Sequence, residues 1–465
     1  MMTPLSISYA WRQLARRVGI PGSNPAGNGF QTLPLEIHYG RPDETTSARP
    51  AIFVIPCAVD AWPKRLTLPD NTLDWLSQDH VLPTGATLLF TDTIPVLFWG
   101  AGYEDGHKPF AERRTDGSVV FYADIIAATL FMLSRWEETV LPDRDEHGRF
   151  PATASVAYKQ SFLDRPIVDE YALILREWLK VLLPNWQPHP RTFSVQLTHD
   201  IDSLRNFVSL PLALRTLVGD VLKRRDARLA YQTLRDAMQQ SVNPREMNHF
   251  KGIAELVRIS QAAGLGRDAF YVMTTNPALL QSDYAYRSPL LRAALDDLRA
   301  QGFEIGLHAG YTTYNNPEKL AEEKARLDTL LGEEHYGGRQ HYLRFTVPNT
   351  WRHWESVRLT YDATLGYPKH AGFRCGTCHP FHPFDIERDA ELSLWEHPLI
   401  VMDGTLKVHR QLTPEQGERR ILQLARRCQA VEGNFVLLWH NSSLHHDWQP
   451  WAEMYARVVR ELAGL

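Results

Sequence analysis

The second half of the chain alternates short apolar runs with amphipathic patterns. Six runs are typical of buried strands, at 193–198, 269–274, 303–308, 341–347, 399–403 and 435–440. Between most of them lie segments with apolar residues at helical spacing, at 249–264, 288–302, 317–332 and 413–431. This alternation predicts parallel strands covered by helices. Six or seven such units would form a distorted (β/α) barrel.

The first 185 residues follow a less regular pattern. Apolar runs at 51–56 and 86–92 predict strands, and segments 123–140 and 164–183 predict amphipathic helices. The stretch LLPNWQPHPRTF at 182–193 carries three prolines, which indicates a boundary between structured regions. We therefore expect a smaller α/β domain at 1–185, followed by the barrel-like domain at 190–465.

Residues 204–248 interrupt the alternation with a long helical pattern that carries a basic face. A solvated surface helix explains such a pattern. It also suits a helix that lies on a membrane surface or against a partner. The sequence leaves these alternatives open.

Composition narrows the classes of function. Of the 465 residues, 44% are hydrophobic and 22% charged, as in ordinary soluble globular proteins. The formal net charge of −4 gives no support to nucleic-acid binding, which usually requires a strongly basic face. We find neither a secretory signal nor a run of about 18 apolar residues. We therefore expect a cytoplasmic protein without an integral membrane segment.

The four cysteines are too few for a disulfide framework, which fits a reducing compartment. Cys375, Cys378 and His379 spell CxxCH, the pattern of c-type haem attachment, and the two thiols also match a redox pair. Haem attachment requires export, and a thioredoxin-like start is missing. A loop with two incidental thiols is the simpler interpretation.

Polar side chains gather where the predicted strands end. Asp200 and Asp202 close the first strand, His308 closes the third, and Asp403 and His440 close the last two. In a parallel barrel the carboxyl ends of the strands meet on one face. We therefore expect these side chains to converge.

Asp200 and Asp202 project to the same side of an extended strand. Two carboxylates at so short a distance repel each other unless a cation lies between them. Asp202 and His308 form an O,N ligand set suited to a divalent metal, best Zn²⁺. Such a metal lowers the pKa of a bound water to about 7. Asp200 is then placed as the general base, and His440 as the acid that protonates a departing amine. Arg344, in the predicted fourth strand, is expected to orient Asp200.

These motifs resemble those of the polysaccharide deacetylases of the NodB-homology type, carbohydrate esterases that act on N-acetyl sugars. The resemblance covers residues from about 190 to 465. It rests on THDID (198–202), EIGLHAGYT (304–312), LRFTVP (343–348), VMDGTL (401–406) and LLWHNSS (437–443). It implies Asp200 as base, Asp202 and His308 as metal ligands, Arg344 as the contact of the base, and His440 as acid, with Asp403 in the catalytic group.

The first 185 residues also carry a resemblance. SRWEE (134–138), DEHGRFPA (145–152) and FLDRPIVDEY (162–171) are similar to an uncharacterised domain that is often fused ahead of such deacetylases. That domain brings no known activity, so the resemblance leaves the task of this region open.

The chain departs from the family at one ligand. The usual second motif is HxxxH, and Thr312 stands four residues after His308. Threonine is a poor ligand for Zn²⁺, so the third ligand is missing or comes from elsewhere. His370 is the candidate, with His379 and His382 behind it.

Further residues are expected to contact the substrate. They lie next to the metal and catalytic motifs and are Tyr311, Thr312, Asn441 and Arg374. Arg374 is a bidentate donor, which suits a sugar-linked phosphate or carboxylate and equally a structural salt bridge.

Together these features predict a metal-dependent deacetylase that hydrolyses the N-acetyl group of an amino sugar in a polysaccharide or glycan precursor. The expected partner is an N-acetylated sugar. A non-catalytic glycan-binding protein on the same scaffold is an alternative, because Thr312 replaces a ligand. Another metal-dependent C–N or C–O hydrolase is a third possibility, since a fold does not fix a substrate.

Overall fold

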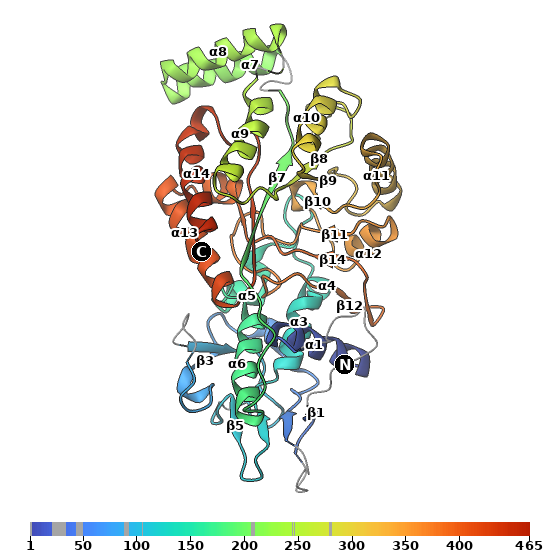
Figure 1. The fold of residues 1–465 in the computed structure, drawn as a ribbon, viewed down its shortest axis with the longest axis vertical. Coiled ribbons are helices and arrows are strands. Elements are labelled where there is room, and N and C mark those ends of the chain that lie inside the picture. The colour runs from blue at the N-terminus through green and yellow to red at the C-terminus, as the bar shows by residue number, and fades with distance from the viewer. Residues whose placement is uncertain are drawn as a thin grey trace.

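The computed structural model describes residues 2–20, 34–42, 50–87, 93–104, 106–205, 210–243, 245, 247–278 and 281–465. The molecule has a mixed α/β architecture. The N-terminal elements lie at one end of its long axis, and the main sheet with its helices occupies the rest (Figure 1).

Eight parallel strands form the main sheet, in the order β14-β11-β10-β9-β8-β7-β16-β15. Their bounds are β7 Ser194–Ile201, β8 Ala269–Val272, β9 Glu304–Ala309, β10 Gly338–Gln340, β11 Tyr361–Asp362, β14 Trp395–Glu396, β15 Val401–Met402 and β16 Asn434–Leu438. The prediction of six or seven strands therefore falls short. Since β14 and β15 end the order, the described strands form a curled half-barrel and not a closed one.

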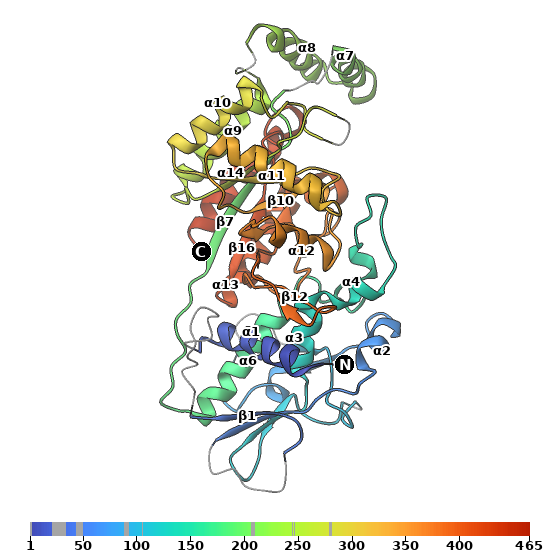
Figure 2. The ribbon, with the colours of Figure 1, turned by 90° about the vertical axis from the view of Figure 1, so that its right-hand side faces the viewer.

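Helices surround this sheet, as the alternation predicted (Figure 2). They are α9 Asn248–Ala262, α10 Pro289–Ala300, α11 Pro317–Leu331, α12 Asn349–Ser356, α13 Pro414–Ala430 and α14 Gln449–Ala463. Local signals explain their starts: α13 begins with a capping box between Thr413 and Gln416, and Asn316 caps α11. Gly332 ends α11 in the left-handed conformation at φ 67°.

The strand predicted at 341–347 is wrong. The fourth strand is β10, and residues His341–Leu343 form a 3₁₀ turn directly after it. β10 reads Gly-Arg-Gln and all three residues are buried, so it carries no apolar run. Gly338 is required here, because a side chain at this position would collide with the carbonyl oxygen of Leu307 on β9.

The N-terminal region contains a four-stranded sheet in the order β1-β2-β6-β5 and a pair, β3-β4. Its strands are β1 Glu36–Tyr39, β2 Ala51–Val54, β3 Asp74–Ser77, β4 Thr93–Val96, β5 Ala111–Arg113 and β6 Val119–Phe121. Its helices are α1 Pro4–Val18, α2 Ala61–Thr67, α3 Ile125–Ser134, α4 Trp136–Val140, α5 Val156–Lys159 and α6 Ile167–Leu182. β2, α3 and α6 confirm their predictions, while the strand predicted at 86–92 falls mostly outside the described residues.

Buried polar contacts join the two regions. The hydroxyl of Tyr9 on α1 donates to the carbonyl of His382 at 2.7 Å. Arg374 donates to both carboxylate oxygens of Glu138, at 2.9 and 2.6 Å. One cluster of buried apolar side chains also runs through both regions. The division into domains at 185–190 remains a prediction, because these contacts alone do not define a boundary.

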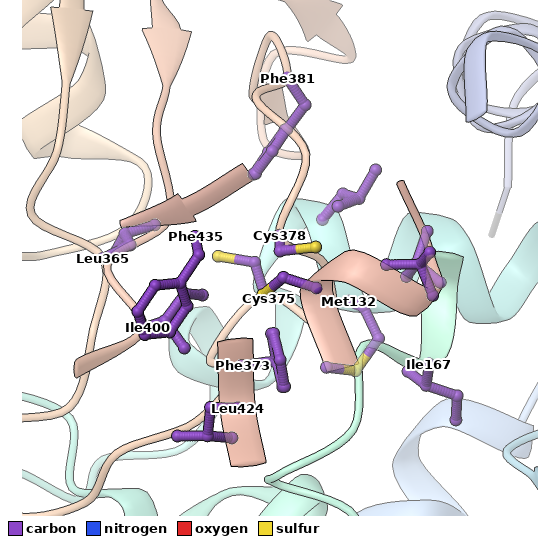
Figure 3. Close-up of a cluster of buried hydrophobic side chains, with 14 of the residues drawn as sticks. Met132, Ile167, Leu365, Phe373, Cys375, Cys378, Phe381, Ile400, Leu424 and Phe435 are labelled. Atoms are coloured by element: carbon purple, nitrogen blue, oxygen red, sulfur yellow. The ribbon is translucent and has the colours of Figure 1, made fainter. Parts of the chain in front are cut away.

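The CxxCH thiols lie in this core. Figure 3 shows Cys375 and Cys378 among apolar side chains from both regions, including Met132 and Ile167. Burial raises the pKa of both thiols, so they are poor nucleophiles. His379 places Nε2 3.0 Å from the carbonyl oxygen of Val431. These contacts fit the interpretation of incidental core thiols.

The predicted insert forms a helical hairpin. α7 (Leu210–Gly219) continues through a π-helical turn, η3 (Asp220–Arg224), and α8 (Ala227–Val242) returns. In both views the hairpin projects from the end of the molecule opposite the N-terminal region (Figures 1 and 2). None of the described helices is both long and apolar enough to cross a bilayer.

Candidate metal and active site

The inner face of the curled sheet carries the candidate site. Strand pairing aligns Asp200 on β7 with Tyr271 on β8, and His308 on β9 with Arg339 on β10. Side chains at aligned positions, and at every second position, share a face. The curl brings β7 close enough to β10 for Arg339 Nη1 to donate to Asp200 Oδ1 at 2.8 Å.

Two groups of described side chains could hold a metal ion: Asp169, Cys378 and His379 in the core, and Asp202, His308 and His341 at this face. Within each group every residue offers one ligand atom, and these atoms all lie within 4.8 Å of one another. Asp202 Oδ1 is 3.0 Å from His308 Nε2 and 3.8 Å from His341 Nε2. The structure therefore brings together Asp202 and His308, as the sequence predicted, and adds His341.

The donor atoms fit a divalent cation. His308 Nδ1 lies 2.9 Å from the carbonyl oxygen of Arg339, which only accepts, so Nδ1 carries a proton and Nε2 is the ring atom that faces Asp202. Among the described residues, Asp202 Oδ1 and His308 Nε2 are buried without a hydrogen-bond partner. Buried polar atoms of this kind require a partner, and one carboxylate with two imidazoles is a ligand set for Zn²⁺.

Electrostatics favour the ligand forms. Burial alone would raise the pKa of Asp202, but the imidazoles of His341, His308 and His440 hold it well below its usual range. Burial lowers the pKa of His341 to about 4, so its ring is neutral near neutral pH. The charged Asp202 carboxylate and the neutral His341 ring are forms that bind metal. At His308 burial alone would lower the pKa, but the carboxylates of Asp200 and Asp202 raise it, so a metal there competes with a proton.

Asp200 is held beside the three ligands by Arg339. Arg339 has no exposed surface, and its guanidinium donates to Asp200, to Thr198 Oγ1 at 3.0 Å and to the carbonyl of Ala363 at 2.8 Å. Asp200 Oδ2 lies 3.6 Å from His308 Nε2. This planar fork fixes the carboxylate with one oxygen directed toward the ligands.

Arg344 does not make the predicted contact. Its guanidinium donates to the carbonyls of His147 and Tyr311, both at 2.7 Å, and lies over the rings of Tyr311 and Tyr314. The structure therefore assigns the contact with Asp200 to Arg339, five positions earlier.

His440 closes the opposite side of the site. Its Nδ1 lies 2.7 Å from Asp403 Oδ1, and its Nε2 points to the site, 3.7 Å from Asp202 Oδ2. Burial alone would lower the pKa of His440, but the carboxylates of Asp403, Asp202 and Asp200 raise it to about 10. His440 is therefore protonated at neutral pH and has a proton to donate.

His370 lies away from the ligand cluster. Its ring packs edge-on to Tyr158, and Arg410 lies 3.5 Å from its Nε2. It lines a cavity of about 1650 Å³ between residues 158–164 and α13, together with several arginines. Cationic neighbours of this kind oppose a metal, and among the described residues His341, not His370, lies with Asp202 and His308.

The four predicted substrate contacts lie in different surroundings. Tyr311 places its hydroxyl 3.0 Å from His147 Nδ1, and Thr312 is exposed beside Lys319. Arg374 is buried in its ion pair with Glu138, the structural alternative considered above. Asn441 is buried and donates to the carbonyls of Ser203 and His249.

The sequence predicted Tyr311 as a substrate contact but missed the two aromatic rings beside it, those of Tyr342 and His147. Tyr342 packs edge-on to His341 and Tyr311, with ring centroids 4.7 and 5.3 Å apart. His147, from the N-terminal region, lies 4.9 Å from the Tyr342 ring. Arg149 Nη1 anchors this loop on the Tyr342 carbonyl at 2.7 Å. In the sequence, the only pointer to His147 and Arg149 was the resemblance of DEHGRFPA (145–152) to a fused domain, and that resemblance implied no role in the site.

Comparisons with known proteins are sparse. A model of a family of unknown function, DUF7033, matches residues 67–184. Among curated proteins, none matches the sequence. A solved structure described as a "putative polysaccharide deacetylase" from Mycobacterium smegmatis is similar over 60% of this chain and 87% of its own, with 15% identity and a TM-score of 0.40.

Proposed function

We propose that the chain is a metal-dependent deacetylase that hydrolyses the N-acetyl group of an amino sugar in a polysaccharide or glycan precursor. One observation carries the proposal. A three-residue ligand cluster, Asp202 with His308 and His341, lies between a carboxylate fixed by an arginine and an imidazolium fixed by a carboxylate. Amide hydrolysis requires a base for water and an acid for the leaving amine on opposite sides of one reacting carbon.

The residues divide the proton transfers. Asp200, held by Arg339, accepts a proton from the attacking water. His440 donates its Nε2 proton to the nitrogen of the departing sugar amine, so that acetate and a free amine leave. Asp403 accepts from His440 Nδ1, which directs Nε2 into the site and stabilises the charged ring.

Asp202, His308 and His341 would hold the metal. When bound, a divalent cation such as Zn²⁺ polarises the acetyl carbonyl and lowers the pKa of water. The Arg339 carbonyl fixes the tautomer of His308, and Asp202 supplies the negative charge that the two neutral imidazoles lack. His341 thereby fills the ligand position that Thr312 leaves open.

The aromatic group supports a sugar substrate. Tyr311, Tyr342 and His147 form a continuous set of rings next to His341. Rings of this kind offer a flat apolar face with a polar edge, which suits the face of a pyranose. In this proposal the N-terminal region contributes to substrate binding through His147.

Two other functions remain as alternatives. The binding-protein alternative rests on the missing ligand at Thr312, and His341 offers a donor that could take its place. Another C–N or C–O hydrolase remains open, because the site does not select between an amide and an ester. The cytoplasmic location also stays a prediction, which cell fractionation of the native protein would test.

The test begins with metal content. Protein purified without chelator is expected to carry about one zinc per chain, measured by elemental analysis. His341→Ala and Asp202→Asn should lose it, and His370→Ala is the matched control that should retain it. Zinc retained by His341→Ala and lost by His370→Ala would contradict the ligand assignment.

Activity is measured as acetate release from a panel of N-acetylated and O-acetylated glycans. Asp200→Asn and His440→Asn should bind metal and lose activity by about 10² to 10⁴-fold, the usual contribution of general acid–base catalysis. Full activity in either variant would reject its role. Release from O-acetyl esters alone would favour the second hydrolase class.

A further inference from the structure

The α7–α8 hairpin exposes an unusual share of the apolar surface. Seven of the sixteen exposed large hydrophobic side chains of the described residues belong to it: Leu214, Val218, Val221, Leu222, Tyr231, Leu234 and Met238. The most exposed are Leu222 at 71% and Tyr231 and Met238 at 67%. Spacings of three and four residues place them along one stripe on each helix.

Most of the apolar side chains that the structure describes on the hairpin lie on its outside. Its fully buried described side chains are small or polar, namely Ala213, Asp220, Ala230, Thr233 and Asp236, while Leu217 and Leu229 are half-buried. Thr233 Oγ1 donates to Asp220 at 2.6 Å across the two helices, so a polar contact holds the hairpin together. A helix pair in water normally has the reverse arrangement. The outer stripes therefore suit an apolar environment.

The charged side chains of the hairpin are also divided between its outside and its inside. Six cationic side chains are exposed on the hairpin: Arg215, Lys223, Arg224, Arg225, Arg228 and Arg235. Two of them form ion pairs within the hairpin, Arg224 with Asp220 and Arg235 with Asp236. Its carboxylates are turned inward or occupied. Asp220 and Asp236 are buried, and Asp226 accepts from the backbone N–H groups of Arg228 and Leu229 at the start of α8. The hairpin surface therefore presents cations beside apolar stripes.

We infer that the α7–α8 hairpin docks on the surface of an anionic lipid bilayer. Exposed apolar stripes enter the boundary between headgroups and acyl chains, and the flanking arginines and lysine meet the lipid phosphates. This positive surface is complementary to anionic lipid, whereas two copies that met through this same face would bring like charges together. The inference does not depend on the chemistry proposed for the site.

Docking of the hairpin would also hold the candidate site close to the bilayer. The chain leaves β7 at Asp202 and enters the hairpin eight residues later at Leu210. At the base of the hairpin, Asp236 Oδ2 lies 2.9 Å from His446 Nε2, and Asn441 bonds to the carbonyl of Ser203. These contacts connect the hairpin to the segment that follows His440. The hairpin would therefore hold the site near the bilayer, where a lipid-linked substrate lies.

The experiment is co-sedimentation of the full chain with vesicles of phosphatidylcholine, with and without phosphatidylglycerol. Wild type should bind the anionic vesicles, and high salt should weaken the binding. Leu222→Ser/Tyr231→Ser/Met238→Ser should lower the partition coefficient by at least about tenfold. A second triple variant, Lys223→Gln/Arg225→Gln/Arg228→Gln, should lower it by roughly 100-fold. The matched control, Val59→Ser/Val408→Ser, changes exposed apolar residues elsewhere and should bind as wild type.

Three outcomes would overturn the inference. Wild type that binds no anionic vesicle is one. Binding that survives both hairpin variants is another. The third is gel filtration showing a dimer that the apolar variant dissociates, without vesicle binding, which would make this face an interface between copies. Because all altered side chains are exposed, the thermal midpoints of the variants should match wild type.

Discussion

Arg339 is expected to stabilise the protein through Asp200, and this can be tested without a substrate. Both side chains are buried, and their nearest atoms lie 2.8 Å apart. Removing one partner of such a pair leaves an uncompensated charge and costs about 3–5 kcal/mol. Arg339→Met should therefore lower the free energy of unfolding by that amount, and Asp200→Asn should also be destabilising.

A double-mutant cycle isolates the pair. Arg339→Met, Asp200→Asn and the double variant are unfolded with urea after treatment with EDTA, so that loss of metal does not contribute. We expect a coupling energy of about 2–3 kcal/mol, since the double variant leaves no buried charge alone. Arg344→Met with Asp200→Asn is the matched cycle, and its coupling should be below about 0.5 kcal/mol.

One outcome of these cycles would contradict the contact between Arg339 and Asp200. If Arg344 couples to Asp200 and Arg339 does not, the assignment read from the apolar run at 341–347 is right and the geometry is wrong. Arg339→Lys adds a second measurement. Lysine keeps the charge but cannot donate to Asp200, Thr198 and Ala363 at once, so stability should fall less than in Arg339→Met while activity still falls.

Further predictions concern charge, thiols and backbone. The pKa of His440 is about 10 when folded against about 6.5 unfolded, so its stabilisation is complete below pH 6.5 and is lost as the pH rises through 10. Urea titrations of metal-free Asp403→Asn should therefore show a deficit that shrinks toward pH 10, and a deficit independent of pH would contradict the pairing. In native protein a thiol reagent should modify at most Cys57 quickly, because the other three cysteines are buried; rapid modification of more thiols would refute this. Gly338→Ala should cost about 3 kcal/mol in urea unfolding through its collision with β9, whereas Gly219→Ala, with open space around it, should stay within about 1 kcal/mol.

The parts of the fold that follow a repeated pattern could be predicted from the sequence. Helices α9, α10, α11 and α13 lie where the amphipathic spacing placed them, because their caps and apolar stripes are local signals. β7, β8, β9 and β16 read as apolar runs because helices cover the sheet. β15, at one edge of the sheet, lies within the run predicted at 399–403. β11 and β14 were not predicted, because they carry two residues each, which is too few for a pattern.

β10 could not be predicted for a different reason. Arg339 and Gln340 are both buried and donate to Asp200 and to backbone carbonyls, so a buried strand reads as polar. An apolar run follows it, and that run displaced the predicted strand by three positions. Arg344 was assigned to the base from that strand and from the resemblance. His370 was proposed without any placement in space.

The spacing of the site residues shows how Arg339 and His341 could have been found from the sequence. β7 and the residue after it present Asp200 and Asp202 to the inner face, two residues apart. β10 and the residue after it present Arg339 and His341 with the same spacing, because Gln340 keeps an extended backbone at φ −75° and ψ 130°. Across the curl, Arg339 meets Asp200 and His341 meets Asp202. On both strands the residue proposed for the base pair, Asp200 or Arg339, thus stands two positions before a proposed metal ligand, Asp202 or His341. An Arg-x-His pair two residues apart, matched to Asp-x-Asp on another strand, is therefore a more specific signal for this site than the hydrophobicity of the strand that carries it.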